Sequence, residues 1–254
     1  MRVFLTGASS GLGEALARHY AGRGATLGLF ARREADLARL AASLAPAEVA
    51  TYTGDVREPS DLAQAAAQFM TRFGMPDVVI ANAGISHGAL TDEPRDLPTF
   101  RAVLETNVLG VVHTFAPFLP AMRAARAGTL AGISSVGGFR GLPGSGAYCG
   151  SKAALIAYLE SLRVELVGSG VSVVTVCPGF IDTPLTKRNP YRMPFLLGPD
   201  EAARLVARAV AQRRRLYVLP WQMAILGRVL RCAPGALFDR VFARRARKPR
   251  APAA

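Results

Sequence analysis

Tyr148 and Lys152 lie four residues apart in the stretch Tyr148-Cys149-Gly150-Ser151-Lys152. On a helix this spacing places the phenol and the ammonium group on one face, one above the other. The pKa of a tyrosine is ordinarily near ~10, and a cation within about 4–6 Å lowers it by favouring the phenolate. The pair could therefore donate and accept a proton near neutral pH. Because this spacing also arises by chance in many helices, the rest of the sequence must decide whether the pair is catalytic.

A glycine-rich turn near the N-terminus has the composition of a phosphate-binding loop. The apolar run 2–5 leads into Gly7, Gly11 and Gly13, and a helical pattern of apolar residues begins at Leu12. Glycines let the backbone approach a pyrophosphate, and a helix N-terminus supplies free N–H groups and the positive end of its dipole. A tight turn without a ligand is the alternative. The strand–turn–helix context favours phosphate binding.

Two arginines follow the next predicted strand, which covers residues 25–31. Dinucleotide-binding folds that use NAD often carry an acid at this point for the ribose 2′-hydroxyl. This chain has Arg32 and Arg33 instead, and a guanidinium group makes paired hydrogen bonds to phosphate oxygens. We interpret Arg32 as a contact to a 2′-phosphate. For Arg33 the same role and that of a solvated residue opening the helix 33–44 stay open.

The hydrophobic pattern alternates strands with helices, which predicts a parallel α/β sheet. The apolar run 78–81 is typical of a strand buried on both faces. Asn107 lies among apolar residues in a predicted helix, where asparagine is unfavourable. It is either a satisfied polar group of the core or part of a relay at the site. The predicted strands are 2–5, 25–31, 49–53, 77–82, 128–134, 171–177 and 215–219, and the later helices are 59–73, 99–125, 148–167 and 199–212.

Together these motifs resemble those of the short-chain dehydrogenase/reductase family over roughly residues 2–219. The matching features are Thr6-Gly7-x-x-x-Gly11-x-Gly13, Asn82-Ala83-Gly84, Asn107, Ser135, Tyr148-x-x-x-Lys152 and Pro178-Gly179. Ser135 lies thirteen residues before Tyr148 and Asn107 forty-one before it, as is usual in the family. The resemblance implies a single Rossmann-type, doubly wound α/β domain of about seven parallel strands with helices on both faces.

The resemblance also implies the catalytic roles. Tyr148 would donate the proton in carbonyl reduction, and Lys152 would lower the pKa of Tyr148 and hold the nicotinamide ribose. Ser135 would bind the substrate oxygen, and Asn107 would anchor a water that links Lys152 to solvent. Ser134 is the alternative serine, but side chains alternate along a strand, so Ser134 should point the other way.

The implied cofactor is NADP(H) in preference to NAD(H), because Arg32 is similar to the basic residue of members that use NADP. Tyr148 and Lys152 would contact the cofactor as well. The other implied contacts are Gly7, Ser9, Ser10, Gly11, Leu12 and Gly13 at the turn, Asp55 and Val56 at the adenine, Asn82, Ala83 and Gly84 at the adenosine ribose, and Pro178, Gly179, Ile181 and Thr183 near the nicotinamide.

The segments that set substrate choice in the family are mostly apolar here. We expect Phe139, Leu142 and Phe180, together with Ser135, to contact the substrate. This composition predicts that the substrate is an apolar ketone, aldehyde or secondary alcohol, and this class includes compounds derived from lipids. Arg188 and Arg192 in the expected lid are either solvated or contacts for an anionic head group.

The C-terminal extension, residues 220–254, carries most of the net charge. From Arg213 onward there are 11 Lys or Arg and one acid, out of a net +13 for the chain. Residues 221–233 and 237–242 show apolar residues at helical spacing with arginines elsewhere, which fits an anionic membrane surface. Docking of the apolar faces on the protein itself or on a second subunit is an equal alternative. We expect no nucleic-acid partner, because the aromatic residues fall on the apolar faces.

Composition limits the remaining possibilities. Three separated cysteines argue against a disulfide framework and a zinc site, and three scattered histidines give no sign of a metal centre. The start has too short an apolar core for a signal peptide, and no long apolar run predicts a spanning helix. We expect a cytoplasmic oxidoreductase, as a homodimer or homotetramer, that could associate with the inner membrane face. A non-catalytic dinucleotide sensor, or a membrane-surface interaction protein on the same fold, is the alternative.

Overall fold

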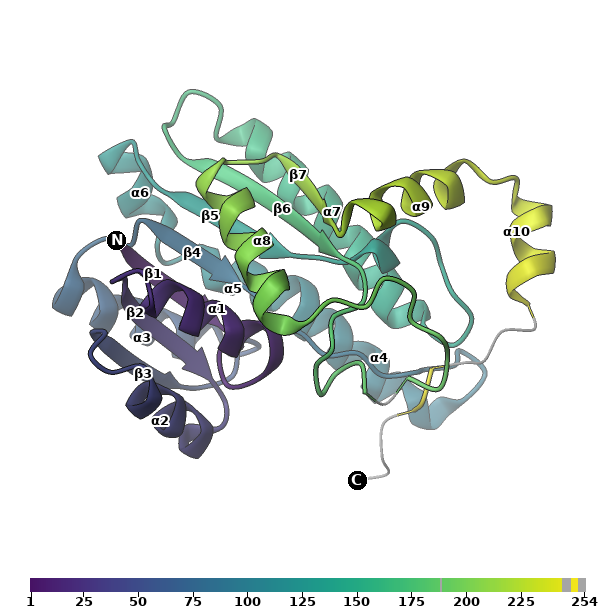
Figure 1. The fold of residues 1–254 in the computed structure, drawn as a ribbon, viewed down its shortest axis with the longest axis horizontal. Helices are drawn as coiled ribbons and strands as arrows, with labels where there is room; N and C mark the ends of the chain where they lie inside the picture. Colours follow the sequence, from purple (N-terminus) through teal and green to yellow (C-terminus); the bar gives the residue numbers. More distant parts are fainter. Residues whose placement is uncertain (188, 244–247, 251–254) are drawn as a thin grey trace.

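The computed structural model of the chain describes residues 1–187, 189–243 and 248–250. One parallel sheet of seven strands runs through the molecule in the order β3-β2-β1-β4-β5-β6-β7 (Figure 1). This confirms the predicted doubly wound fold. The strands are β1 (Arg2–Thr6), β2 (Thr26–Ala31), β3 (Val49–Thr53), β4 (Val78–Ala81), β5 (Thr129–Ile133), β6 (Ser172–Pro178) and β7 (Leu216–Leu219).

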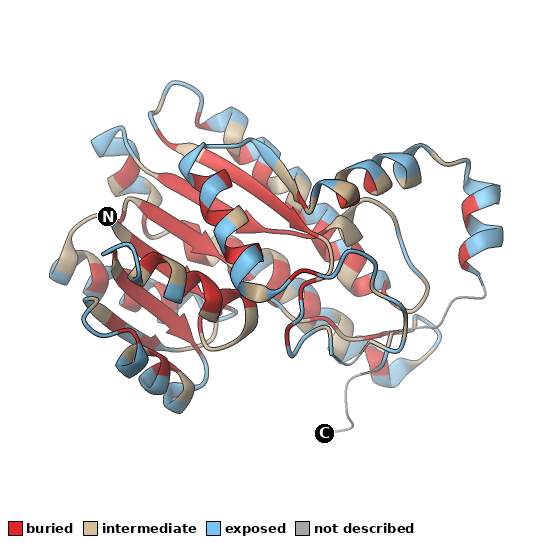
Figure 2. Ribbon diagram, in the orientation of Figure 1, coloured by how far each residue is buried: buried red, intermediate tan, exposed pale blue. Residues whose placement is uncertain are grey.

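Helices cover both faces of the sheet because alternate strand residues are apolar on both sides. In β1, Val3 and Leu5 point into one core and Phe4 into the other. Figure 2 shows the sheet as the buried centre of the molecule. One face packs against α1 (Gly11–Ala21), α2 (Glu34–Ser43) and α8 (Pro199–Ala211), and the other against α3 (Pro59–Phe73), α5 (Gly110–Phe115) and α7 (Gly146–Glu165).

The predicted helical stretch 99–125 is helical over most of its length but is interrupted at residues 116–118. The structure has α4 (Leu97–Leu104), a π-helical turn over Glu105–Leu109, then α5, and finally α6 (Leu119–Ala125). The π-helical turn contains Asn107, whose side-chain hydrogen bonds are described below. Pro120 stands in the first turn of α6, a position where its missing N–H costs nothing. Two short 3₁₀ turns cover Pro94–Asp96 and Val136–Gly138.

The C-terminal extension forms α9 (Trp221–Cys232) and α10 (Gly235–Phe242). One side of α9 docks on the body. A Cβ added to Gly227 would lie 2.6 Å from the ring of Phe139, so the helix and ring are in close contact. The buried residues are Met223, Gly227, Phe238 and Phe242, whereas Trp221, Ile225 and Val229 are more than half exposed. The domain boundary after Leu219 stays a prediction, since α9 packs on the body.

The predicted site residues lie at the carboxyl ends of the strands. In the strand order, β1 lies between β2 and β4, and the order reverses there. Open α/β sheets bind ligands at such a switch point. The turn after β1, the turn after β2 and the loop after β4 therefore meet at one edge, where the site must lie.

Candidate active site

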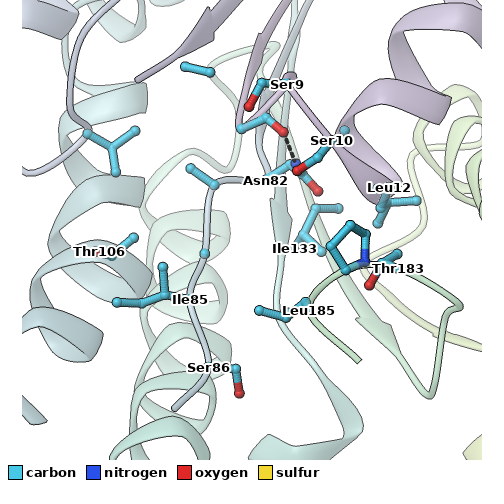
Figure 3. A pocket seen from close by; sticks show the side chains of 18 of the residues that line it. Ser9, Ser10, Leu12, Asn82, Ile85, Ser86, Thr106, Ile133, Thr183 and Leu185 are labelled. Atoms are coloured by element: carbon cyan, nitrogen blue, oxygen red, sulfur yellow. Dashed lines mark hydrogen bonds between the residues drawn. The ribbon is translucent and has the colours of Figure 1, made fainter. Parts of the chain in front are cut away.

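A cavity of about 390 Å³ lies along this edge, and every residue predicted to bind the cofactor lines it. Its lining continues from the glycine-rich turn to Ser135, Tyr148 and Lys152. Figure 3 shows the cavity with side chains from several elements, namely Ser9, Ser10 and Leu12 from the turn and α1, Ile85 and Ser86 from the loop after β4, Thr106, and Thr183 and Leu185 from the segment after β6.

The glycine-rich turn is packed too closely to hold side chains at two of its glycines. Gly7 has φ +68°, and a Cβ there would lie 2.7 Å from the Cα of Ala83. A Cβ on Gly13 would lie 2.1 Å from the carbonyl oxygen of Gly7. Asn82 holds the turn by donating its side-chain N–H to that same oxygen at 3.2 Å. The turn opens α1 with no side-chain cap, and it fits a pyrophosphate.

Both arginines after β2 line the cavity. The Arg32 side chain is 62% exposed and its guanidinium lies 3.9 Å from the Asp55 carboxylate. Arg33 donates a hydrogen bond to the Ser9 hydroxyl at 3.0 Å and pairs with Asp36. Arg33 thus contacts the glycine-rich turn directly. The sequence left open whether this arginine binds phosphate or is solvated. The residues present fit an anionic group at this end of a dinucleotide.

Ser135 and Ser134 point in different directions, as strand alternation predicts. The Ser135 hydroxyl accepts a hydrogen bond from the Gly137 N–H at 3.0 Å. Burial raises the pKa of Tyr148 to about 12, and a hydrogen bond with Ser135 opposes that shift. The Ser134 hydroxyl instead donates to the carbonyl of Lys152 at 2.9 Å. Ser135 is therefore the serine beside the tyrosine.

Lys152 lies in the cavity lining, but its ammonium group is directed to the strand. It donates a hydrogen bond to the Ile133 carbonyl at 2.8 Å, and burial lowers its pKa to about 8. The lowering of the tyrosine pKa by this lysine stays a prediction. At neutral pH the phenol is protonated and suited to donate a proton.

Asn107 is fully buried and does not line the cavity. Its side-chain oxygen accepts from the Ile85 N–H at 2.9 Å, and its amide donates to the Ile85 carbonyl and the Ser151 hydroxyl, each at 3.0 Å. These contacts match the interpretation as a satisfied polar group of the core. They also fix the loop after β4 to the π-helical turn and to α7. The relay through a water stays a prediction.

The three apolar residues predicted to contact substrate lie outside the cavity lining. Phe139 packs against α9 at Gly227, and Phe180 meets the ring of Tyr191 edge-on at 6.4 Å between centroids. Leu142 is on the surface. The places of Phe139 and Phe180 are set by packing with α9 and with Tyr191, which local sequence does not reveal. Other apolar side chains do line the cavity, among them Ile85 and Leu185. Arg192 is exposed, and Arg188 lies outside the described residues.

One residue that sequence reasoning missed is Lys248. Its ammonium group lies 4.6 Å from the centroid of the Tyr148 ring and hydrogen-bonds the Ser86 hydroxyl. The sequence places it in a basic run at the end of the chain, with no signal that distinguishes it from its neighbours. Only the fold brings it to Tyr148.

Within the described residues, no group of His, Cys, Asp or Glu is arranged to hold a metal ion. None of the described helices is by itself long and apolar enough to cross a membrane. The stretch 94–115 taken together with α6 reaches the required length and composition, but it bends by 40° at its break.

Comparison with known proteins identifies the family. The family model for short chain dehydrogenases matches residues 1–193. An uncharacterized oxidoreductase of Myxococcus xanthus is 38% identical, over 93% of this chain and 94% of the relative. The 11-beta-hydroxysteroid dehydrogenase A of Arachis hypogaea is 40% identical over 73% of this chain, which spans only 53% of that relative's length.

Among solved structures, a short chain dehydrogenase/reductase of Burkholderia phymatum in complex with NAD superimposes with a TM-score of 0.82. It is 26% identical, and the match covers 100% of this chain and 97% of that one. The glycine-rich turn, the seven-stranded sheet, the family model and these relatives agree: the chain belongs to the short-chain dehydrogenase/reductase family of oxidoreductases, which act on CH–OH or C=O groups.

Proposed function

We propose that the protein transfers hydride between NADP(H) and an apolar ketone, aldehyde or secondary alcohol, with Tyr148 as the general acid and base. The observation that carries this proposal is the single cavity whose lining runs from the glycine-rich turn past Arg32 to Ser135 and Tyr148. A dinucleotide held at the turn would extend toward the tyrosine, so that cofactor and substrate meet beside its hydroxyl group.

The chain's own groups then supply the proton chemistry. Bound NADPH would supply hydride to the carbonyl carbon. Tyr148 gives its proton to the oxygen on which charge develops, and Ser135 holds that oxygen with a hydrogen bond. Lys152, an ammonium group buried beside the site, would hold the ribose hydroxyls. Ile85 and Leu185 in the lining favour a substrate that is apolar around the carbonyl.

The preference for NADP(H) is proposed from the charge at the end of β2. Arg32 and Arg33 line the cavity there, and the Asp36 carboxylate further on is already paired with Arg33 and Arg39. No free acid among the described residues is placed to bind a ribose 2′-hydroxyl at this end. Two guanidinium groups suit a 2′-phosphate.

We expect NADPH to support reduction of a panel of apolar ketones and aldehydes with a kcat/KM at least about tenfold above that with NADH. The panel includes a keto steroid, since the Arachis relative is named a hydroxysteroid dehydrogenase. Arg32→Ala should remove most of this preference by raising the KM for NADPH about 10–100-fold, because a charge-assisted contact to the phosphate is lost. The readout is the loss of absorbance of the reduced nicotinamide as NADPH or NADH is oxidised.

The matched control is Arg39→Ala, which removes an exposed arginine from α2 that pairs with the same Asp36. It should keep the preference for NADPH. Equal use of NADH by the wild-type protein would overturn the interpretation of Arg32. Tight binding of NADPH with no turnover of any carbonyl would instead favour the non-catalytic sensor.

We also propose that the C-terminal extension associates with an anionic membrane surface. Trp221, Ile225 and Val229 recur every four residues and form an exposed apolar ridge on α9. Arg228 and Arg231 on the same helix are exposed as well. The opposite side of the helix is the one buried on the body, so docking and membrane contact use different faces. Such a ridge beside cationic residues fits the interface of an acidic bilayer.

The purified protein should sediment with vesicles that contain phosphatidylserine and much less with neutral vesicles. Replacing Trp221, Ile225 and Val229 together by serine should leave most of the protein in the supernatant. The control replaces two exposed apolar residues, Val164 in the last turn of α7 and Val167 just after it, by serine and should sediment like the wild type. Equal sedimentation of the two variants would leave the ridge without a membrane role. Assembly as a homodimer or homotetramer stays a prediction.

A further inference from the structure

The C-terminal segment Lys248–Arg250, which we call the strap, lies directly on the loop after β4. The Gly88 N–H donates to the Pro249 carbonyl at 2.7 Å, and Gly88 forms a parallel bridge with Arg250. A Cβ on Gly88 would lie 2.2 Å from the Lys248 carbonyl oxygen. The contact is therefore backbone against backbone, at a point where the loop has no side chain. Figure 1 draws the strap as a short yellow segment.

Arg250 anchors the strap through two acids of the same loop. Its Nε donates to Asp96 at 2.9 Å, and its guanidinium lies 3.2 Å from Glu93. Asp96 is buried and also accepts the Leu90 N–H at 2.9 Å. That backbone hydrogen bond and then Arg250 lower the pKa of Asp96, so its carboxylate is charged at neutral pH. The strap is thus held by a charge pair as well as by backbone contacts.

This anchoring sets the position of Lys248 at the catalytic tyrosine. The ammonium group hydrogen-bonds Ser86, a residue of the cavity lining, and lies 4.6 Å from the centroid of the Tyr148 ring. Burial lowers the pKa of Lys248 to about 8, so most of it is still charged at pH ~7. A cation is therefore held next to the proton donor.

Lys248 has no counterion within the described part of the chain. The acids of the neighbouring loop are engaged by Arg250, and no described carboxylate lies within salt-bridge distance of the lysine ammonium. A hydroxyl group and an aromatic face compensate a buried charge only in part. An anion brought by the substrate would complete the set of contacts.

We propose that Lys248 binds a carboxylate of the substrate, so that the protein acts on oxo acids or the corresponding hydroxy acids. This inference rests on the proposed function and narrows its substrate class. Tyr148 must reach the oxygen of the reacting carbonyl with its hydroxyl, while Lys248 lies against the same ring. The carboxylate and the carbonyl are therefore separated by only a few bonds, and the remaining chain is apolar.

The opposing possibility is that the strap only closes the site and leaves when substrate enters. In that case removing Lys248 would help every substrate, or none in particular. A carboxylate-binding lysine instead predicts a loss confined to acids. The two possibilities differ for the acids, because removal of Lys248 lowers kcat/KM for acids selectively in one case and affects acid and ester alike in the other, so one variant separates them.

The experiment compares α-, β- and γ-oxo acids of medium chain length with their methyl esters, using NADPH and the whole chain of residues 1–254. The wild type should show a higher kcat/KM for the acid in at least one pair. Lys248→Met should lower kcat/KM for that acid at least about tenfold, mainly through KM, and change that of the ester less than about threefold. Arg250→Met, which releases the strap, should shift the same acid in the same direction.

The control is Arg240→Met, which removes one exposed positive charge from α10 and should leave the acid-to-ester ratio unchanged. NADPH affinity, measured by the fluorescence of the bound nucleotide, should be the same in all variants. The proposal is overturned if the wild type favours the ester in every pair, if Lys248→Met affects acid and ester equally, or if it accelerates both. Failure of the wild type to reduce any acid or ester would contradict the proposed function itself.

Discussion

Tyr148→Phe is expected to lower kcat/KM for carbonyl reduction by about 10²–10⁴-fold, the usual contribution of a general acid. The substitution removes only the hydroxyl, and the ring that packs below Lys248 stays. Burial holds the pKa of this phenol near 12, so the wild-type group carries its proton at neutral pH and can donate it to the developing alkoxide. The affinity for NADPH should change little, since the glycine-rich turn and Arg32 are untouched.

The measurement pairs steady-state turnover with NADPH binding by fluorescence titration. Tyr158→Phe is the matched control, because Tyr158 lies on the same helix α7 and packs against the core away from the cavity. It should keep wild-type turnover. If Tyr148→Phe still turned over substrate at a rate near that of the wild type, the proton would have to come from another group, and Tyr148 would lose the assigned role.

The sheet was predictable because its signal is local. Runs such as Val78-Val79-Ile80-Ala81 are apolar at every position, and a strand buried on both faces requires that. The glycine-rich turn was predictable for a similar reason. Glycine is required at Gly7 and Gly13 by close contacts within the turn itself and with one neighbouring loop. The sequence motif therefore contains most of the residues that make these glycines necessary. The motif spacing then placed Ser135 and Tyr148 beside one another.

Features set by distant contacts were not predictable. The π-helical turn around Asn107 coincides with hydrogen bonds to Ile85 and Ser151, far away in sequence. Phe139 is directed by α9, and a helical pattern does not reveal which side of α9 will be buried. Lys248 is the extreme case, since its partner Ser86 lies 162 residues earlier. Each of these depends on how separate elements meet, which a local pattern does not encode.

The loop after β4 connects these distant contacts. Its start is fixed by Asn107 through Ile85, and its middle is tied to the segment before α7, where the Ala89 N–H donates to the Gly144 carbonyl at 3.2 Å. Its far end holds the strap through Asp96. A change in this loop should therefore alter the position of Lys248 relative to Tyr148. Because we propose that Lys248 binds the substrate carboxylate, such a change should alter substrate choice even where the changed residue does not contact the substrate.

Gly13→Ala is expected to disrupt the cofactor end of the site. A methyl group on Gly13 would lie 2.1 Å from the Gly7 carbonyl oxygen and 2.7 Å from the Asn82 side-chain nitrogen, so the turn or α1 must move. Overpacking of this kind costs about 2–3 kcal/mol, which corresponds to a Tm lower by about 4–12 °C for a domain of this size. The Kd for NADPH should rise at least about tenfold, because the N–H groups at the start of α1 no longer point at the pyrophosphate.

Gly150→Ala separates this effect from the general cost of changing a helical glycine. Gly150 lies inside α7, and a Cβ there meets no atom within 4 Å. Alanine has the higher helix propensity, so this variant should be as stable as the wild type or more stable by up to about 1 kcal/mol, with NADPH binding unchanged. Differential scanning calorimetry and nucleotide titration of both variants give the comparison. If Gly13→Ala bound NADPH as tightly as Gly150→Ala, the close approach of α1 to the Gly7 carbonyl would not be needed for pyrophosphate binding. The protein would then hold the cofactor chiefly at its other end, through Arg32 and Arg33.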